Sequence, residues 1–204
     1  DLHSFPTRRS SDLHIGGALQ LPPGLLTTPD GGQIHVDDRC GIVNEGGMYG
    51  SLTPTIVTFD PDLIAQQPYQ ACVLLNGLGA VLEGFAVAGP SIDDRVPRCI
   101  RVRGHAAVCR FMQAFWATEF GFHVEARVAD NSNANNFGLE HCRAARCGKA
   151  GFYTNGEEAN AGYIIGCIAD GNEGYGIFES SFLGNPYYGC HASNNLYGDR
   201  KSVV

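Results

Sequence analysis

The 204-residue sequence predicts an all-β fold, a parallel β-helix in which short strands coil into a stack of about seven turns. A strand-like segment centred on a cysteine recurs at steps of 25 and 23 residues, at Cys142, Cys167 and Cys190. The segments between strands are rich in Gly, Asn and Asp, which tolerate the positive φ of tight turns. Glycine accounts for 27 residues, and helical periodicity is weak throughout.

The cysteine-centred segments predict an interior column of thiols. Because successive side chains in a strand point to opposite faces, Cys142 and Ala144 should share the inner face while Arg143 points outward. The two later segments repeat this pattern, so their thiols should stack over Cys142, where free cysteine behaves as a small hydrophobic residue. Glu140 departs from the pattern, since the same alternation turns its carboxylate inward, and we expect it to lie at the open end of the strand.

The other strands follow the same period. Segments that begin with glycine and an aromatic or aliphatic residue occur at 121–124, 151–154 and 176–179, and upstream 72–77 matches 99–104 at a step of 27. Such short units cannot bury an apolar face alone, but they can when stacked ~4.8 Å apart. Residues 106–120 are the best candidate for a helix, and their apolar side chains do not form one stripe.

Both ends of the chain carry residues that we interpret as foreign. A DNA sequence can be written that encodes residues 199–204. Its complementary strand, read in one frame, encodes Arg-Arg-Ser-Ser-Asp, which is the sequence at 8–12. Two ends coded by the two strands of one oligonucleotide are typical of a translated sequencing adapter. We therefore predict adapter-derived segments at 1–13 and 199–204 around an incomplete β-helix domain at 14–198, and expect the natural N-terminus to lie outside this sequence. The alternative is a short natural basic arm.

Composition argues against two classes of partner. The net charge of −7 disfavours a protein that binds nucleic acid through its phosphates, which needs a basic face. No apolar run approaches the ~20 residues of a membrane span. The eight cysteines include no C-x-x-C pair, so we predict no metal site built on cysteine. Many free thiols favour assembly in a reducing compartment.

The stretch Gly-Gly-Ala-Leu-Gln-Leu-Pro-Pro-Gly at 16–24 resembles the start of pectate-lyase-like (pectin lyase-like) right-handed β-helix proteins. Residues 34–36 and 41–46 resemble the strands that follow there, and 178–185 is similar to turns of uncharacterised members that include bacteriophage tail proteins. The resemblance covers nearly all of 14–198 and implies a right-handed coil. The superfamily includes lyases, hydrolases, tailspikes and non-catalytic members, so the resemblance implies polysaccharide as the partner and leaves the activity open.

The catalytic motifs of that superfamily are missing. The Asn-Thr-Asp, Gly-His-Gly and Arg-x-Lys motifs of its polygalacturonase branch do not occur. The pectate-lyase branch uses Ca²⁺-binding carboxylates and a basic Arg or Lys, whereas 14–198 contains only one lysine, Lys149, so no catalytic set carries over from the family. Asp93 and Asp94 are the candidate catalytic residues, because paired carboxylates can act as acid and base or bind Ca²⁺, the candidate cofactor. The alternative is a charged turn in solvent.

Two clusters are candidates for substrate binding. If Ile100 and Val102 face the core, Arg101, Arg103 and His105 lie on one outer face, where arginines could neutralise the carboxylate of an acidic sugar.

His123 and Glu125 form the second cluster, ahead of an Asn-rich loop at 130–136 that could contact a ligand. For the arginine cluster the alternative is a solvated charged face. For the second cluster and its loop the alternative is a turn stabilised by Asn side chains.

These patterns lead us to expect a protein that binds or degrades polysaccharide along a lateral groove. An enzyme of this kind would be a polysaccharide lyase or a glycoside hydrolase. The alternative is a non-catalytic shaft, either a host-attachment component of a phage tail or a surface adhesin. We expect an extracellular or virion-associated protein, and by resemblance to tailspikes a homotrimer in the full-length form.

Overall fold

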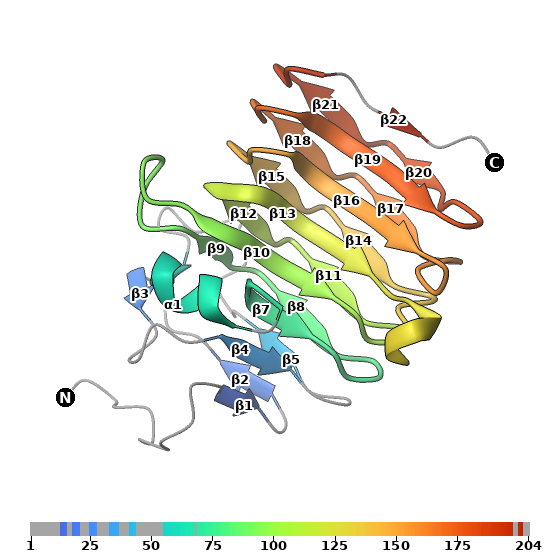
Figure 1. Cartoon of the computed structure of the whole chain (residues 1–204), viewed down its shortest axis with the longest axis horizontal. Helices are drawn as coiled ribbons and strands as arrows, with labels where there is room; N and C mark the ends of the chain where they lie inside the picture. The colour runs from blue at the N-terminus through green and yellow to red at the C-terminus, as the bar shows by residue number, and fades with distance from the viewer. Residues whose placement is uncertain are drawn as a thin grey trace.

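The computed structural model describes residues 33–36, 55–67 and 69–197, and the strand backbone at 13–15, 18–20, 25–27, 41–43 and 200–201. In this part of the chain the strands form three parallel sheets, A, B and C, of eight, seven and seven strands (Figure 1). The chain adds one strand to each sheet in turn and then begins the next turn. This is the all-β parallel β-helix that the sequence predicts.

The strands of each sheet are short, and sheet A has the longest. Sheet A consists of β1 (Leu13–Ile15), β4 (Ile34–Val36), β7 (Ala71–Leu75), β10 (Val96–Val102), β13 (Ala117–Glu125), β16 (Ala150–Gly156), β19 (Tyr175–Ser181) and β22 (Arg200–Lys201). Sheet B consists of β2 (Ala18–Gln20), β5 (Gly41–Val43), β8 (Val81–Glu83), β11 (Val108–Arg110), β14 (Gly138–Glu140), β17 (Tyr163–Ile165) and β20 (Tyr187–Tyr188). Sheet C consists of β3 (Leu25–Thr27), β6 (Ile56–Thr58), β9 (Ala86–Ala88), β12 (Gln113–Phe115), β15 (Arg143–Ala145), β18 (Ile168–Asp170) and β21 (His191–Ser193).

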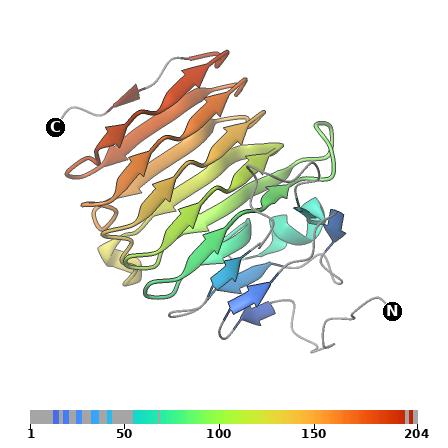
Figure 2. The ribbon, with the colours of Figure 1, turned by 180° about the vertical axis from the view of Figure 1, so that it is seen from behind.

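The coil is right-handed. In Figure 1 the strands of sheet A cross the front from left to right while successive turns rise towards the C-terminus, and Figure 2 shows the other strands returning behind. Five turns, β7 to β21, are described without a gap, and strands of two earlier turns extend the same sheets. The predicted number of about seven turns is therefore close to what the structure describes.

Like residues stack over like residues in the core. Ile100, Phe122, Phe152 and Ile177 are partners in register along sheet A, and each is at most 6% exposed. The rings of Phe122 and Phe152 lie 4.9 Å apart and nearly parallel. Burial of one such side chain contributes roughly 1.5–3 kcal/mol, so these interior rows are a main source of stability.

The predicted column of thiols is confirmed. The register of β15, β18 and β21 places Cys142, Cys167 and Cys190, each directly before its strand, over one another. Each thiol donates a hydrogen bond to a carbonyl of the preceding turn at 3.4–3.5 Å. Every described cysteine is free, and burial raises the pKa of the Cys147 thiol to about 12. Cys40 lies outside the described residues.

Residues with a left-handed backbone conformation form the corners between sheets B and C. One of these corners shows that the inward direction expected for the Glu140 carboxylate is wrong. The sequence pattern treats 140–144 as one strand, but His141 has a φ of 52° and separates β14 from β15. Because this corner resets the alternation, the Glu140 carboxylate points outward and pairs with Arg110 at 2.8 Å. Gly166 and Gly189 take the same conformation one and two turns later.

The interior also holds a carboxylate that the sequence analysis does not single out. Glu179 lies in register with the inward Thr154 and is fully buried. Its oxygens accept hydrogen bonds from the Ser181 amide at 2.8 Å, the Asn185 amide group at 3.1 Å and the Tyr187 hydroxyl at 2.6 Å. These donors compensate the cost of burying the carboxylate.

Helical structure differs from the expectation in one place. The region 106–120 is extended, as its irregular pattern indicates, with β11, β12 and the start of β13. One helix, α1 (Pro61–Gln66), was not predicted, although Asp60 caps it by accepting from two backbone amides and Pro61 opens it. The α1 helix packs on the outside of sheet A, against β7 and β10, and a short 3₁₀ helix, η1 (Val128–Asp130), follows β13.

The adapter interpretation falls almost entirely outside the described residues. Of 1–13 and 199–204, Leu13 belongs to β1, and Arg200 and Lys201 form β22. Their assignment to a sequencing adapter, and with it the domain boundary at 14–198, stays a prediction.

Replacing a corner residue by glycine should stabilise the fold. Ala161 is exposed and has a φ of 53°, which strains any residue with a Cβ, so we expect Ala161→Gly to raise the free energy of unfolding by about 0.5–1 kcal/mol. Ala65→Gly is the control: Ala65 is also exposed but lies inside α1, where glycine should cost about 1 kcal/mol. Urea unfolding of both variants measures the difference, and a loss of stability in Ala161→Gly would contradict the corner argument.

Candidate functional site: a polar network on sheet A

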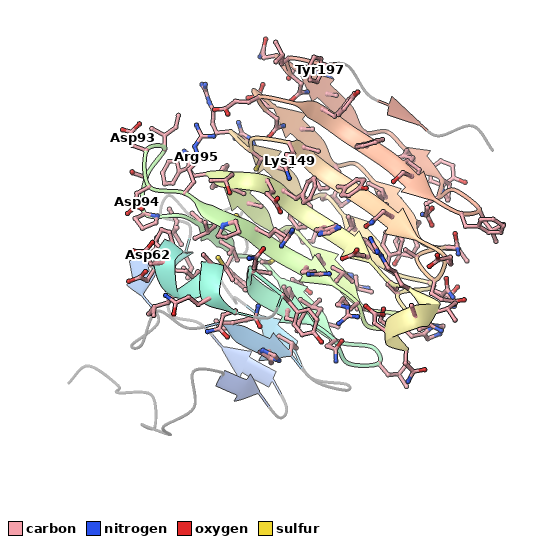
Figure 3. All side chains as sticks on the ribbon, in the orientation of Figure 1. Asp62, Asp93, Asp94, Arg95, Lys149 and Tyr197 are labelled. Carbon is pink, nitrogen blue, oxygen red and sulfur yellow. The ribbon has the colours of Figure 1, made fainter. Side chains whose placement is uncertain are left out.

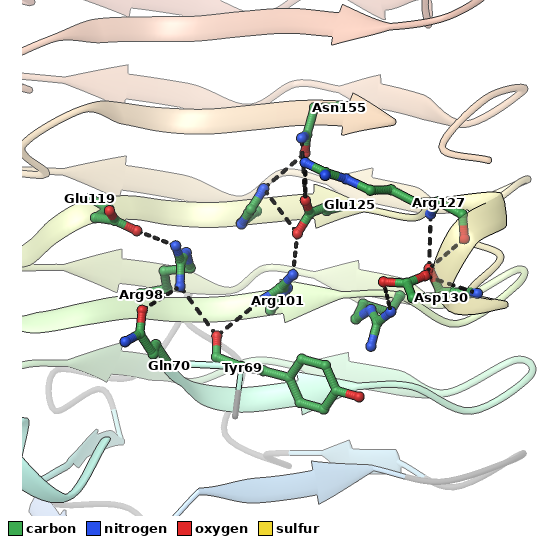
Figure 4. A network of polar contacts seen from close by, with 12 residues as sticks. Tyr69, Gln70, Arg98, Arg101, Glu119, Glu125, Arg127, Asp130 and Asn155 are labelled. Atoms are coloured by element: carbon green, nitrogen blue, oxygen red, sulfur yellow. Dashed lines mark hydrogen bonds and ion pairs between the residues drawn. The ribbon is translucent and has the colours of Figure 1, made fainter. Parts of the chain in front are cut away.

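The outer face of sheet A carries a network of charged and polar side chains over three successive turns (Figure 4). Outward positions recur in register, so Arg101 of β10 lies next to His123 of β13, which lies next to Tyr153 of β16. The network, called the sheet A network below, consists of Tyr69, Arg98, Arg101, Arg103, Glu119, His123, Glu125, Arg127, Asp130 and Asn155.

Three arginines of β10 and its end form the base of the network. Arg98 pairs with Glu119, Arg101 pairs with Glu125, and Arg103 donates to Asp130 at 2.5 Å. Because each pair joins one turn to the next or to the loop after β13, these contacts clamp neighbouring turns together. The Arg103 side chain is 4% exposed, although it stands on an outer face.

The Tyr69 ring and carbonyl cover these arginines from below. The ring lies 5.3 Å from the Arg101 guanidinium and 4.6 Å from that of Arg103, within the range of cation–π attraction. The Tyr69 carbonyl accepts from Arg101 at 3.0 Å and from Arg98 at 3.3 Å.

Glu125 and His123 are joined through Asn155. The Asn155 side-chain amide donates to Glu125 at 3.4 Å, so its oxygen is left to accept from His123 Nε2 at 2.9 Å. Glu125 also pairs with Arg127 at 2.9 Å. His123 Nδ1 is buried and has no partner among the described residues.

Burial and charge set the protonation states of this centre. Burial, together with the nearby positive charges of Arg101 and Arg98, lowers the pKa of His123 to about 3, so the imidazole is neutral at pH 7. Burial raises the pKa of Glu125, but its interactions with His123, Arg101 and Arg127 and the hydrogen bond from Asn155 lower it, and the pKa lies below its ordinary value. Burial lowers the pKa of Arg101.

The network is locally positive and has unused donors. The network has four arginines, and Lys149 pairs with Glu119 at 2.5 Å, so five basic side chains face three carboxylates. The whole chain, in contrast, has a net charge of −7. The Nε–H groups of Arg98, Arg101 and Arg103 are buried and have no acceptor among the described residues. A buried donor without an acceptor costs about 1–3 kcal/mol, so the burial of these three groups is uncompensated by hydrogen bonds among the described residues.

Aromatic rings continue the outer face towards the C-terminus. Phe120, Tyr153 and Phe178 stack on one another at 4.6 and 5.0 Å between ring centroids. Since their ring faces contact each other, these residues present mainly ring edges to solvent. Tyr187 points to the interior Glu179, while Tyr188 is exposed.

The structure brings together four of the five candidate binding residues: Arg101, Arg103, His123 and Glu125. His105 lies beyond the end of β10, where its ring nitrogens contact Asn133 and Asn136 at 3.3 Å. The Asn-rich loop there has the side-chain hydrogen bonds of the predicted alternative, since the Asn135 side chain accepts from the backbone amide of Asn160 at 2.8 Å in the next turn. Its contact with a ligand stays a prediction.

Asp93 and Asp94 lie apart from Arg101 and Arg103 of the network. They are exposed in the loop before β10, at one edge of the molecule (Figure 3), whereas Arg101 and Arg103 lie where β10 ends. A seven-residue strand spans roughly 20 Å, so the two aspartates lie near the end of β10 opposite to Arg101 and Arg103. Their backbone amides bond to the Ser91 hydroxyl at 3.2 and 3.1 Å.

Sequence reasoning did not include Tyr69, Arg98, Glu119, Arg127 or Asn155. Of these, Asn155 had a usable signal, since it lies one period after Glu125 on an outward position of the next Gly-aromatic strand. Tyr69 had no such signal, because it precedes β7 in a segment outside the repeat.

The described residues contain neither a metal-binding cluster nor a membrane-spanning helix. No group of three or more His, Cys, Asp or Glu side chains is arranged to hold a metal ion. None of the helices in this part of the chain has the length and apolar character required to cross a membrane.

Comparison with protein-family models, with curated proteins and with solved structures found no match to this chain. The parallel β-helix therefore stands on the strand order and register alone. The resemblance to pectate-lyase-like proteins stays a prediction from the sequence.

The neutral, buried His123 predicts a pH-dependent stability. Between pH 6.5 and about 3 the unfolded chain binds a proton that the folded His123 does not, so stability should fall as the pH is lowered through this range. We expect His123→Gln to flatten the slope by up to ~1.4 kcal/mol per pH unit. Urea unfolding at several pH values from 7 to 4 measures it, and equal slopes in the two proteins would contradict a neutral His123.

Proposed function

We propose that this protein binds polysaccharide on the outer face of sheet A, with Arg101, Arg103, His123 and Glu125 of the sheet A network as ligand-binding residues. The observation that carries the proposal is the excess of basic over acidic side chains in the sheet A network, on a chain whose net charge is −7. Sugar hydroxyls and carboxylates are suitable acceptors for arginine. The face runs over several turns, which suits an extended chain of sugars.

The ligand-binding role predicts a loss of affinity when Arg101 is replaced. We expect Arg101→Gln to weaken binding of a hexuronic acid oligosaccharide by about tenfold, because a hydrogen bond to a charged group contributes about 1.5 kcal/mol or more. Isothermal titration calorimetry measures the affinity. Arg143→Gln is the matched control, since Arg143 is an arginine on the outer face of sheet C that pairs with Asp170 at 3.3 Å. Equal losses in the two variants, or none in either, would contradict the proposal.

If the protein is also an enzyme, we propose Asp93 and Asp94 as its acid and base, and a lyase or glycoside hydrolase reaction. Their separation from Arg101 and Arg103 means that the scissile bond would lie near the start of β10, while the sugars further along contact these arginines. We expect Asp93→Asn and Asp94→Asn each to reduce product formation at least roughly 100-fold, the contribution typical of acid–base catalysis. Assays for new reducing ends and unsaturated sugars measure it, and unchanged turnover in both variants would remove this assignment.

A non-catalytic shaft of a phage tail or an adhesin is the second candidate, and the aromatic stacking on sheet A favours it. The ring faces of Phe120, Tyr153 and Phe178 are used for contacts between turns, as in a rod whose stiffness is the useful property. In that case the full-length protein is expected as a homotrimer outside the cell or on the virion. Light scattering on a full-length form tests the oligomeric state.

A further inference from the structure

The α1 strap, defined as α1 with Gln67, Tyr69 and Gln70, occupies guanidinium donors that an external ligand would need. The Arg101 Nη1 group donates to the Tyr69 carbonyl and its Nη2 group to Glu125. In Arg98 the Nη1 group likewise faces the Tyr69 carbonyl and Gln70 Oε1, at 3.3 and 3.4 Å, and Nη2 faces Glu119. Each guanidinium therefore bridges the strap and β13 (Figure 4).

The donors that remain are inaccessible while the strap is in place. The Nε–H groups of Arg98 and Arg101 are buried, and the Tyr69 ring lies over Arg101. A carboxylate binds arginine best through two neighbouring N–H groups. A sugar carboxylate can receive such a pair of bonds only if the strap releases the Nη1 groups.

The two ends of the strap are held differently. At its start Ile64 is fully buried within the hydrophobic core cluster, and Asp60 caps the helix with bonds of 2.9 and 3.2 Å. At its end the arginine bonds and the cation–π contacts of Tyr69 join it to sheet A, and Gln70 Nε2 donates to the Ala65 carbonyl at 3.2 Å. Gln70, which joins the strap to β7, has a φ of 47°, a conformation that strains a residue other than glycine.

We infer that the α1 strap is an internal competitor for the polysaccharide site: Tyr69 masks Arg98 and Arg101, and an anionic sugar unit binds when the end of the strap moves away. This regulation rests on the proposed binding site. It predicts that weakening the strap strengthens ligand binding, the opposite of the effect expected for a residue that contacts ligand. Apparent affinity falls in proportion to the fraction of molecules in the competent state.

Two variants loosen the strap without changing an arginine. Tyr69→Ala removes the ring from Arg101 and Arg103, and Asp60→Ala removes the cap of α1. We expect each to bind a hexuronic acid oligosaccharide about 5-fold more tightly than the wild-type protein. Tyr69→Phe is the control, because it retains the ring and should bind as the wild type does. Weaker binding in both loosened variants would show that the strap supports the site, and would overturn the inference.

A second measurement does not depend on sugar binding. Phenylglyoxal modifies accessible guanidinium groups, and mass spectrometry locates the modified residues. We expect Arg98 and Arg101 to react at least roughly 3-fold faster in Tyr69→Ala and Asp60→Ala, with Arg143 of sheet C as an internal reference of unchanged rate. Unchanged rates at Arg98 and Arg101 in both variants would overturn the inference.

The two measurements separate this inference from the proposed function. If the arginines become more reactive but neither the wild type nor a loosened variant binds the oligosaccharide, the masking stands and the proposed function fails. If the wild type binds and the arginines keep their wild-type reactivity in both variants, the proposed function stands and the strap is not a competitor. Asp60→Ala keeps the test valid should Tyr69→Ala fail to fold.

Discussion

Each interior turn of this β-helix must lie in register over the turn before it, because its backbone amides and carbonyls bond to neighbouring turns and not to strands of the same turn. That constraint depends on the corners. His141, Gly166 and Gly189 all adopt left-handed conformations at equivalent places, and the amides of the first two donate to carbonyls of the next turn at 2.8 Å. A corner displaced by one residue would exchange the inner and outer faces of the following strand.

The same constraint creates the outer face on which the candidate site lies. Because register repeats from turn to turn, a charged residue at an outward position has its counterparts one strand away in both directions, at about 4.8 Å. Arg101 therefore meets His123, and Glu125 meets Asn155, without any loop that brings them together. A β-helix can assemble a continuous binding surface from side chains spaced about 25 residues apart in the sequence.

The charges on this face serve two purposes that compete. Pairing with Glu119, Glu125 and Asp130 compensates the burial of the arginines and ties neighbouring turns together. The same pairing uses the donors with which arginine would bind an anion. Tyr69 adds to this balance, since its carbonyl accepts hydrogen bonds from Arg98 and Arg101. A site of this kind must exchange internal contacts for external ones.

The sequence by itself determined the solenoid, the thiol column from Cys142 onward and the outward direction of Arg101, because a repeating period and a strict alternation are local patterns that stacking preserves. It did not determine where the alternation of inward and outward side chains restarts, because the left-handed corner at His141 has no glycine to mark it. The predicted direction of the Glu140 side chain was therefore wrong. Only the tertiary structure decided that Tyr69 covers the arginines, because an insertion outside the repeat is placed by its packing on sheet A rather than by register.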